Sequence, residues 1–301
     1  MNSLKPTILD TDIASGIGGD VDDALALLLA LSLNELDLKA VTIVYGRVDV
    51  KAQLALNLLA LTNRRDVTVA MGASQPLTPG VFRKGGQEGF MVEHVEALDP
   101  RLKTSSVHAI DVIGGLAREY GEVNLITIGP LTNLALAILR YPDLIDHVEK
   151  VYVMGGAFRQ YLDNGLRVPV TEYNVRADPI AAKIVFESGI PITLVPLDVT
   201  LQTRLYAKDI DKLETDKKDV LNYVRSLISG REFWYMHDPL TVGVAVNKGF
   251  VETMNMCVTV EVKGEHTMGE TVAVNGKPNA EVCVKIKPRE FIEFYLSTVF
   301  G

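Results

Sequence analysis

The sequence predicts an α/β fold with an open, mostly parallel, doubly wound sheet of the Rossmann type, C-terminal helices and a small antiparallel elaboration. Three observations predict it. Short apolar runs rich in β-branched residues recur along the chain, segments with helical spacing of apolar residues separate them, and acidic or glycine-rich turns follow several of the runs. Apolar strands that alternate with helices are typical of βαβ units, whose parallel sheet is covered on both faces.

The expected elements follow one another with few interruptions. Strands, each a run of β-branched and other apolar residues, are expected at 7–12, 38–45, 67–71, 123–128, 151–154 and 192–197. Helices, the first of them rich in alanine and leucine, are expected at 21–33, 50–61, 107–120, 132–139 and 179–187. Beyond Leu205 the pattern changes to helices and short antiparallel strands, expected at 208–214, 219–229, 257–262, 271–274 and 282–286. Because no linker rich in proline, glycine or serine divides the chain, residues 1–301 are interpreted as a single domain.

Composition excludes several classes of protein. The chain has 301 residues, 48% hydrophobic and 23% charged, and a core of this size needs no disulfide or structural zinc. Cys257 and Cys283 lack the spacing of a metal or redox motif and are expected to be reduced core thiols. The net charge of −8 argues against nucleic-acid binding. Since no apolar stretch has signal-peptide or membrane-span length, we expect a cytoplasmic protein without membrane association.

Acidic residues are concentrated where the first expected strand ends. Asp10 and Asp12 close that strand, and after a glycine-rich turn Asp22 and Asp23 open the next helix. Ligands bind at the carboxyl ends of strands in open parallel sheets, and clustered carboxylates bind hard divalent cations. Helix capping explains acids at a helix start, but an unpaired charge within an apolar strand is costly. We therefore expect a metal site here.

Other polar groups follow the later strands. They are Gly129–Asn133, Gly155–Gly156, Glu172–Asn174, Asp178, Asp198 and His237–Asp238. Each alone has an ordinary structural explanation, but together they place polar groups at several strand ends of one sheet. The turn at 15–19 does not predict a phosphate loop, because it lacks the lysine and serine or threonine of a P-loop and its acidic neighbours repel anions.

In this order, the motifs resemble those of the inosine/uridine-preferring nucleoside hydrolases. The family signature is an N-terminal DxD, a short glycine-containing turn and a DD pair that opens a helix, here Asp10–Thr11–Asp12 and Asp22–Asp23. The resemblance continues to Leu240 through Ile128–Ala135, Met154–Gly156, Glu172–Asn174, Asp178–Pro179, Leu197–Thr200 and His237–Leu240. It implies a calcium-dependent enzyme that hydrolyses the N-glycosidic bond of ribonucleosides to ribose and free base, with a homodimer or homotetramer as its assembly.

The resemblance also implies roles for individual residues around the metal. The Ca²⁺ ligands would be the carboxylates of Asp12, Asp23 and Asp238 and the main-chain carbonyl of Ile128. Asp12 would also be the general base toward the metal-bound water, and His237 the acid toward the leaving base. Asp10 would support the ligand cluster without binding the metal itself. These residue types suit the chemistry, because carboxylates stabilise an oxocarbenium-like sugar and an imidazole that titrates near neutrality can deliver a proton.

Substrate contacts are implied in the same way. Asp22, Glu172 and Asn174 would hold the ribose hydroxyls. Arg47 stands where the family has a ribose-contacting asparagine, so it could pair with a carboxylate of the metal loop, recognise an anionic group such as a 5′-phosphate, or block the pocket. Tyr235 could stack on the base or simply pack its own segment.

The match departs from the family in two further places, and two alternatives stay open. The turn between Asp12 and Asp22 is longer than usual, and neither the histidine expected near 84–89 nor the asparagine expected shortly before Glu172 stands in place, although Asn164 is close. One alternative is a catalytically silent metal- and sugar-binding homologue. The other is a HAD-like phosphatase, which shares a strand ending in DxD but gives Glu172 and the later acids no role.

Overall fold

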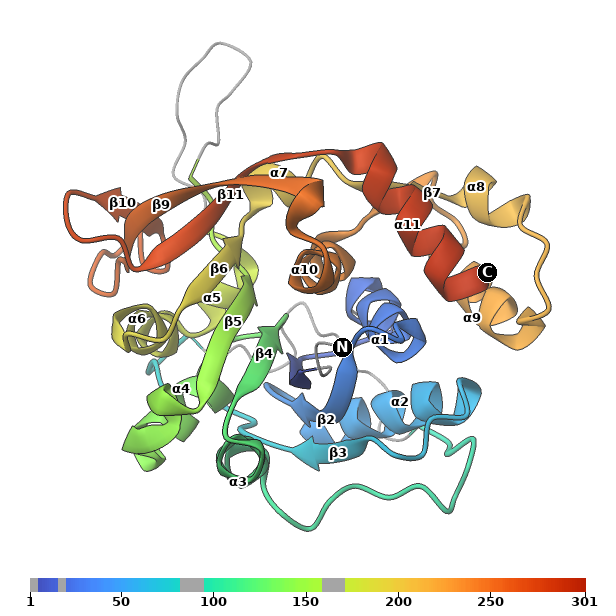
Figure 1. Cartoon of the computed structure of the whole chain (residues 1–301), viewed down its shortest axis with the longest axis horizontal. Coiled ribbons are helices and arrows are strands. Elements are labelled where there is room, and N and C mark those ends of the chain that lie inside the picture. The colour runs from blue at the N-terminus through green and yellow to red at the C-terminus, as the bar shows by residue number, and fades with distance from the viewer. Residues whose placement is uncertain (1–4, 16–19, 82–94, 159–170) are drawn as a thin grey trace.

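Figure 1 shows the chain in a computed structural model, which describes residues 5–15, 20–81, 95–158 and 171–301. Within these ranges the main sheet has nine strands in the order β10-β9-β11-β6-β5-β4-β1-β2-β3. Its strands are β1 (Pro6–Thr11), β2 (Asp37–Ile43), β3 (Thr68–Met71), β4 (Val123–Thr127), β5 (Val148–Met154), β6 (Ile192–Val195), β9 (Val251–Val260), β10 (Thr271–Val274) and β11 (Ala280–Ile286). A separate antiparallel pair joins β7 (Arg204–Tyr206) to β8 (Phe233–Tyr235).

Helices cover both faces of this sheet, as a doubly wound fold requires (Figure 1). One face is packed by α1 (Asp22–Ser32), α2 (Val48–Leu61), α9 (Lys218–Ile228), α10 (His237–Val246) and α11 (Pro288–Phe300). The other is packed by α3 (Ala109–Tyr120), α4 (Thr132–Arg140) and α6 (Pro179–Glu187). Shorter helices are α5 (Tyr173–Ala177), α7 (Leu197–Thr200), α8 (Ala207–Asp211), η1 (Pro142–Asp146) and η2 (Lys248–Phe250).

The strand order determines where a ligand binds. From β3 to β6 the order is β3-β2-β1-β4-β5-β6, and the neighbouring strands are parallel. The order reverses between β1 and β4, which pair with each other. In such sheets a crevice forms at the carboxyl ends of the two strands on either side of the reversal. The predicted fold class is confirmed, and β1 ends at this crevice.

The last third of the chain differs from the sequence-based prediction in its pairing. The strand predicted at 282–286 was expected to be antiparallel, but β11 pairs parallel with β6 and antiparallel with β9, so it extends the main sheet. Two α-helices in this part of the chain, α10 and α11, were not predicted. α10 is buried around its whole circumference, so its Val-Gly-Val-Ala-Val segment has no helical period. α11 does have one, since Phe291, Tyr295 and Val299 form its buried stripe.

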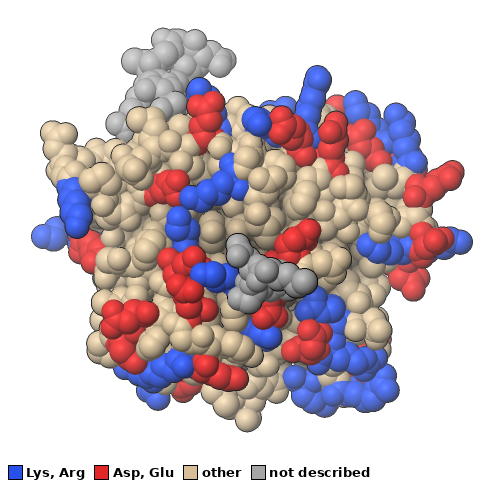
Figure 2. Space-filling model, in the orientation of Figure 1, with Lys and Arg blue, Asp and Glu red and all other residues tan. Residues whose placement is uncertain are grey.

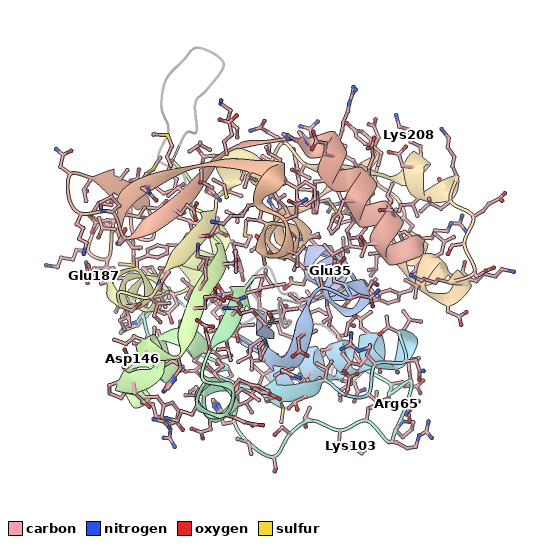
Figure 3. All side chains as sticks on the ribbon, in the orientation of Figure 1. Glu35, Arg65, Lys103, Asp146, Glu187 and Lys208 are labelled. Atoms are coloured by element: carbon pink, nitrogen blue, oxygen red, sulfur yellow. The ribbon has the colours of Figure 1, made fainter. Side chains whose placement is uncertain are left out.

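The exterior carries charges of both signs. Figure 2 shows lysine and arginine interspersed with aspartate and glutamate on one face, and in Figure 3 the labelled side chains of Arg65, Lys103 and Lys208 lie at the rim, pointing away from the sheet. None of the helices in the described ranges combines the length and apolarity that a bilayer crossing requires. Both cysteines are free thiols; Cys283 is buried as expected, whereas Cys257 is only half-buried.

Candidate active site

A cavity of about 760 Å³ lies at the carboxyl ends of the parallel strands. Its walls come from the segment after β1, the starts of α1, α5 and α10, and the ends of β4 and β5. Predicted site residues that line it are Asp12, Asp22, Asp23, Ile128, Glu172, Asn174, His237 and Asp238. The structure thus brings together residues that the chain supplies from five separate segments.

Three buried carboxylates meet in this cavity. Asp22, Asp23 and Asp238 each offer an oxygen that lies within 4.8 Å of the oxygens offered by the other two. They meet because α1 and α10, which pack against each other, both begin here with acids in their first turns. The N-terminal ends of the two helix dipoles favour negative charge at this point. Asp23 is also held by the Thr11 hydroxyl, which donates a hydrogen bond of 2.5 Å to its Oδ1.

Burial makes this group of acids costly to ionise. Burial, followed by the charge of Asp20, raises the pKa of Asp22 to about 7. The pKa values of Asp23 and Asp238 are raised well above the usual value by burial and then by neighbouring aspartates. Like charges this close suppress one another's ionisation unless a cation offsets them. Because carboxylate oxygens are the preferred ligands of hard divalent cations, the donor set fits such an ion.

Asp12 lies on the adjoining wall of the cavity. A side chain at Gly129 would not fit, since a Cβ there would lie 2.8 Å from both the main-chain nitrogen and Oδ1 of Asp12. On the other side, Lys51 Nζ donates a hydrogen bond of 2.6 Å to the Asp12 carbonyl and lies 3.6 Å from Asp12 Oδ2. Burial raises the pKa of Asp12, and the charge of Lys51 opposes that rise.

Lys51 was not predicted as a site residue. The sequence held one signal for it, because Lys51 shares the buried face of α2 with Ala55 and Leu58, where a charged residue is unexpected.

Ile128, Asn174 and Glu172 are connected by hydrogen bonds. The amide of Asn174 donates to the carbonyls of Ile128 at 3.1 Å and Met154 at 3.3 Å. Glu172 caps α5 by accepting from the main-chain N–H groups of Asn174 and Val175, and it also accepts from Gly156. Burial, the largest effect, raises the pKa of Glu172 to about 7 despite these hydrogen bonds. The capping interaction orients the carboxylate while leaving it at the cavity wall.

Asp10 is fully buried near the end of β1. Its Oδ1 accepts from the Thr42 hydroxyl at 2.5 Å and from the Asn133 amide at 2.8 Å, which ties β1 to β2 and α4. Among the described residues, Oδ2 has no hydrogen-bond partner. Burial raises the pKa of Asp10 to about 7. Asp10 therefore braces the strand end and does not face the cavity.

His237 opens α10 within the cavity. Its Nδ1 lies 2.7 Å from the Thr200 hydroxyl, and its ring centre lies 5.4 Å from that of Tyr235. Burial lowers the pKa of His237 to about 4, because the enclosed ring loses the water that would stabilise its cation. This direction is opposite to what an imidazole titrating near neutrality would require, so the ring is expected to be neutral at pH 7.

Besides Asp10, two predicted residues lie outside the main cavity. Arg47 is exposed, and its guanidinium makes a bidentate ion pair with Asp49, at 2.9 and 2.8 Å, on the first turn of α2. Among the described contacts of Arg47, the partner carboxylate is thus a neighbour on α2. Tyr235 lines a smaller adjacent cavity of about 360 Å³.

Trp234 and Arg231, which were not predicted to bind ligand, line both cavities, with the Arg231 guanidinium 4.0 Å from the indole centre. Their signal in the sequence was weak, because an aromatic run before a helix usually packs that helix. The glycines at 16–19, the segment 84–89 and Asn164, which were considered from the sequence, lie outside the described residues.

Comparison with known proteins identifies the family. The sequence profile described as inosine-uridine preferring nucleoside hydrolase matches residues 7–293. The chain belongs to this family. Its members hydrolyse the N-glycosidic bonds of nucleosides, so the chain is an N-glycosyl hydrolase, and both the silent homologue and the phosphatase lose their support. The family is metal-dependent, in agreement with the buried acids of the cavity.

Relatives and solved structures match over nearly the whole chain. The chain is 33% identical to the pyrimidine-specific ribonucleoside hydrolase RihA of Photobacterium profundum. The alignment has 288 positions and covers 89% of this chain and 88% of the relative. The chain is also 32% identical to RihA of Escherichia coli, in an alignment of 308 positions that covers 96% of each chain. Among solved structures, a plant nucleoside hydrolase is 27% identical with a TM-score of 0.83 and 99% of each chain covered. A purine-preferring ribonucleoside hydrolase from Gardnerella vaginalis is 29% identical, with a TM-score of 0.80 and 98% of each chain covered.

Proposed function

We propose that this nucleoside hydrolase uses Ca²⁺, with Asp12 as the general base, to convert ribonucleosides to ribose and free base. The observation that carries the proposal is the group of buried carboxylates in one cavity at the carboxyl ends of the strands. The proposed ligands are the carboxylates of Asp12, Asp23 and Asp238 and the carbonyl of Ile128. Calcium is favoured because it takes six to eight oxygen ligands in flexible geometry, whereas zinc prefers nitrogen and sulfur.

The residues of the cavity can be assigned to successive parts of the reaction. When bound, the cation polarises the attacking water and orients the ribose hydroxyls. Asp12 accepts the proton of that water, and Asp22, Glu172 and Asn174 hold the 2′- and 3′-hydroxyls. As the glycosidic bond lengthens, the sugar gains positive charge, which the surrounding carboxylates stabilise. Asp10 acts indirectly, through its hydrogen bonds at the end of β1.

Ribose release from a panel of nucleosides tests the proposed function. We expect release from at least one of uridine, cytidine, inosine and adenosine in the presence of calcium. Relatives of similar identity are named for pyrimidine and for purine preference, so both classes belong in the panel. Because Arg47 is paired with Asp49 outside the cavity, the 5′-monophosphates are expected to be no better substrates than the nucleosides. No ribose from any compound would overturn the proposal.

His237→Phe is expected to slow nucleosides selectively. In the proposal the Thr200 hydroxyl donates to Nδ1, which leaves the ring proton on Nε2 to be shared with the leaving base. Loss of such acid assistance costs about 100-fold in kcat. The rate on p-nitrophenyl riboside is expected to stay near that of the wild type, because its leaving group departs as a stable phenolate. Equal losses on both substrates would show that His237 supports the cavity and does not assist departure of the base.

A further inference from the structure

Lys51 is a fully buried lysine for which the proposed reaction has no role. Its side chain has no exposed surface, and it extends from α2 to contact Asp12. A buried ammonium is costly unless its charge and its hydrogen-bond donors are matched by partners. Asp12 supplies two of the contacts of Lys51, one through its main-chain carbonyl and one through its carboxylate.

Main-chain hydrogen bonds show what the first contact does. The carbonyl of Asp10 accepts from Ile128 N at 2.8 Å and that of Thr11 accepts from Val44 N at 3.0 Å, so both are satisfied by neighbouring segments of the sheet. Asp12 lies one residue beyond β1, and its carbonyl accepts instead from Lys51 Nζ at 2.6 Å. A buried carbonyl without a donor is rare. Lys51 therefore extends the hydrogen bonding of β1 to the residue that carries the proposed base.

The second contact concerns charge. Lys51 Nζ lies 3.6 Å from Asp12 Oδ2, and Asp12 lines a cavity together with the carboxylates of Asp22, Asp23 and Asp238. A positive charge at this distance attracts the Asp12 carboxylate and offsets part of the repulsion among the acids. It acts whether or not a cation is bound, because it belongs to the chain itself.

We propose that Lys51 is a positioning residue for Asp12. It holds both the main-chain carbonyl and the carboxylate of Asp12, so that the acid is in place before a cation binds. This inference deepens the proposed function and takes from it the role of Asp12. The two physical effects of Lys51 on cation binding have opposite signs. Fixing a ligand strengthens binding, whereas a nearby like charge repels the ion and weakens it. The sign of the change on removing the ammonium therefore decides between them.

Calorimetric titration of CaCl₂ into the metal-free protein measures that sign. Lys51→Met keeps the aliphatic stem and removes the ammonium, and it is expected to weaken calcium binding by about 10-fold or more, as loss of groups that orient ligands does. Lys51→Arg, which keeps a charged donor, is expected to recover part of the loss. Lys39→Met is the matched control, because Lys39 is a partly exposed lysine of β2 paired with Asp37 far from the cavity, and its variant is expected to bind as the wild type does.

Turnover gives a second readout. With saturating calcium, Lys51→Met is expected to lower kcat by about 10-fold or more while KM changes little, because a misplaced base affects the chemical step. Calcium binding by Lys51→Met as tight as or tighter than that of the wild type would overturn the inference. If this variant does not fold, Lys51→Gln is judged by the same criterion. Calorimetry records cation binding without turnover, so the wild type's ribose release tests the proposed function separately.

Discussion

Replacing Asp12 with asparagine is expected to lower kcat/KM for nucleosides by about 10³-fold, in line with the roughly 10²–10⁴-fold contribution of a general base. The amide has the shape of the carboxylate but cannot accept a proton from water. It also removes one negative charge from the oxygen ligands proposed for the cation. Initial rates of ribose release at saturating calcium measure the effect.

The matched control for Asp12 is an exposed aspartate. Asp143 is paired with Arg118 on the surface, so Asp143→Asn is expected to retain wild-type activity. The thermal midpoint of the Asp12 variant with calcium present shows whether it is folded. A folded Asp12→Asn enzyme that keeps more than about a tenth of the wild-type rate would remove Asp12 from the role of base, since general-base catalysis contributes more than this.

Removal of divalent cations by EDTA is expected to abolish ribose release and to lower the thermal midpoint. The buried carboxyls of Asp22, Asp23 and Asp238 carry raised pKa values because burial and mutual repulsion oppose their ionisation, and a bound cation relieves both. At a concentration about 100-fold above its Kd, a cation stabilises the folded state by about 2.7 kcal/mol. For a protein of this size that corresponds to a shift of about 5 °C in a calorimetric scan.

Re-addition of single ions identifies the cation. Calcium is expected to restore activity and midpoint together, with magnesium less effective because it requires smaller, near-octahedral coordination. Restoration by zinc and not by calcium would overturn the calcium assignment while leaving a metal site in place. Full activity in protein shown by mass spectrometry to be free of metal would contradict metal dependence itself.

Local signals made much of the fold predictable. Apolar strand runs and amphipathic helices of the first two thirds appear in the structure within a few residues of their expected positions, because each depends on nearby sequence. α10 was missed because it is buried on every side and, unlike the equally buried but alanine- and leucine-rich α1, contains valines and a glycine, which are weaker helix formers. The parallel pairing of β11 with β6 was missed because partner choice depends on distant segments.

The same distinction applies to the cavity. Asp22 and Asp23 stand out locally as acids at a helix start, and resemblance to a family linked them to Asp238 and Glu172. Lys51 was not recognised, since a lysine in a helix is usually exposed and its contact with Asp12, distant in the sequence, is visible only in the structure. The ion pair of Arg47 with Asp49 is likewise a matter of side-chain geometry that sequence spacing does not determine.

The origin of the three clustered carboxylates has a consequence for how the protein acquires activity. Asp22 and Asp23 come from the start of α1, but Asp238 comes from α10, late in the chain. During synthesis the N-terminal half emerges first, so a nascent chain cannot bring the three acids together until residue 238 has left the ribosome. Contacts between such distant segments form slowly. If these acids hold a cation as proposed, high-affinity binding is expected to be a late event in folding and to report its completion.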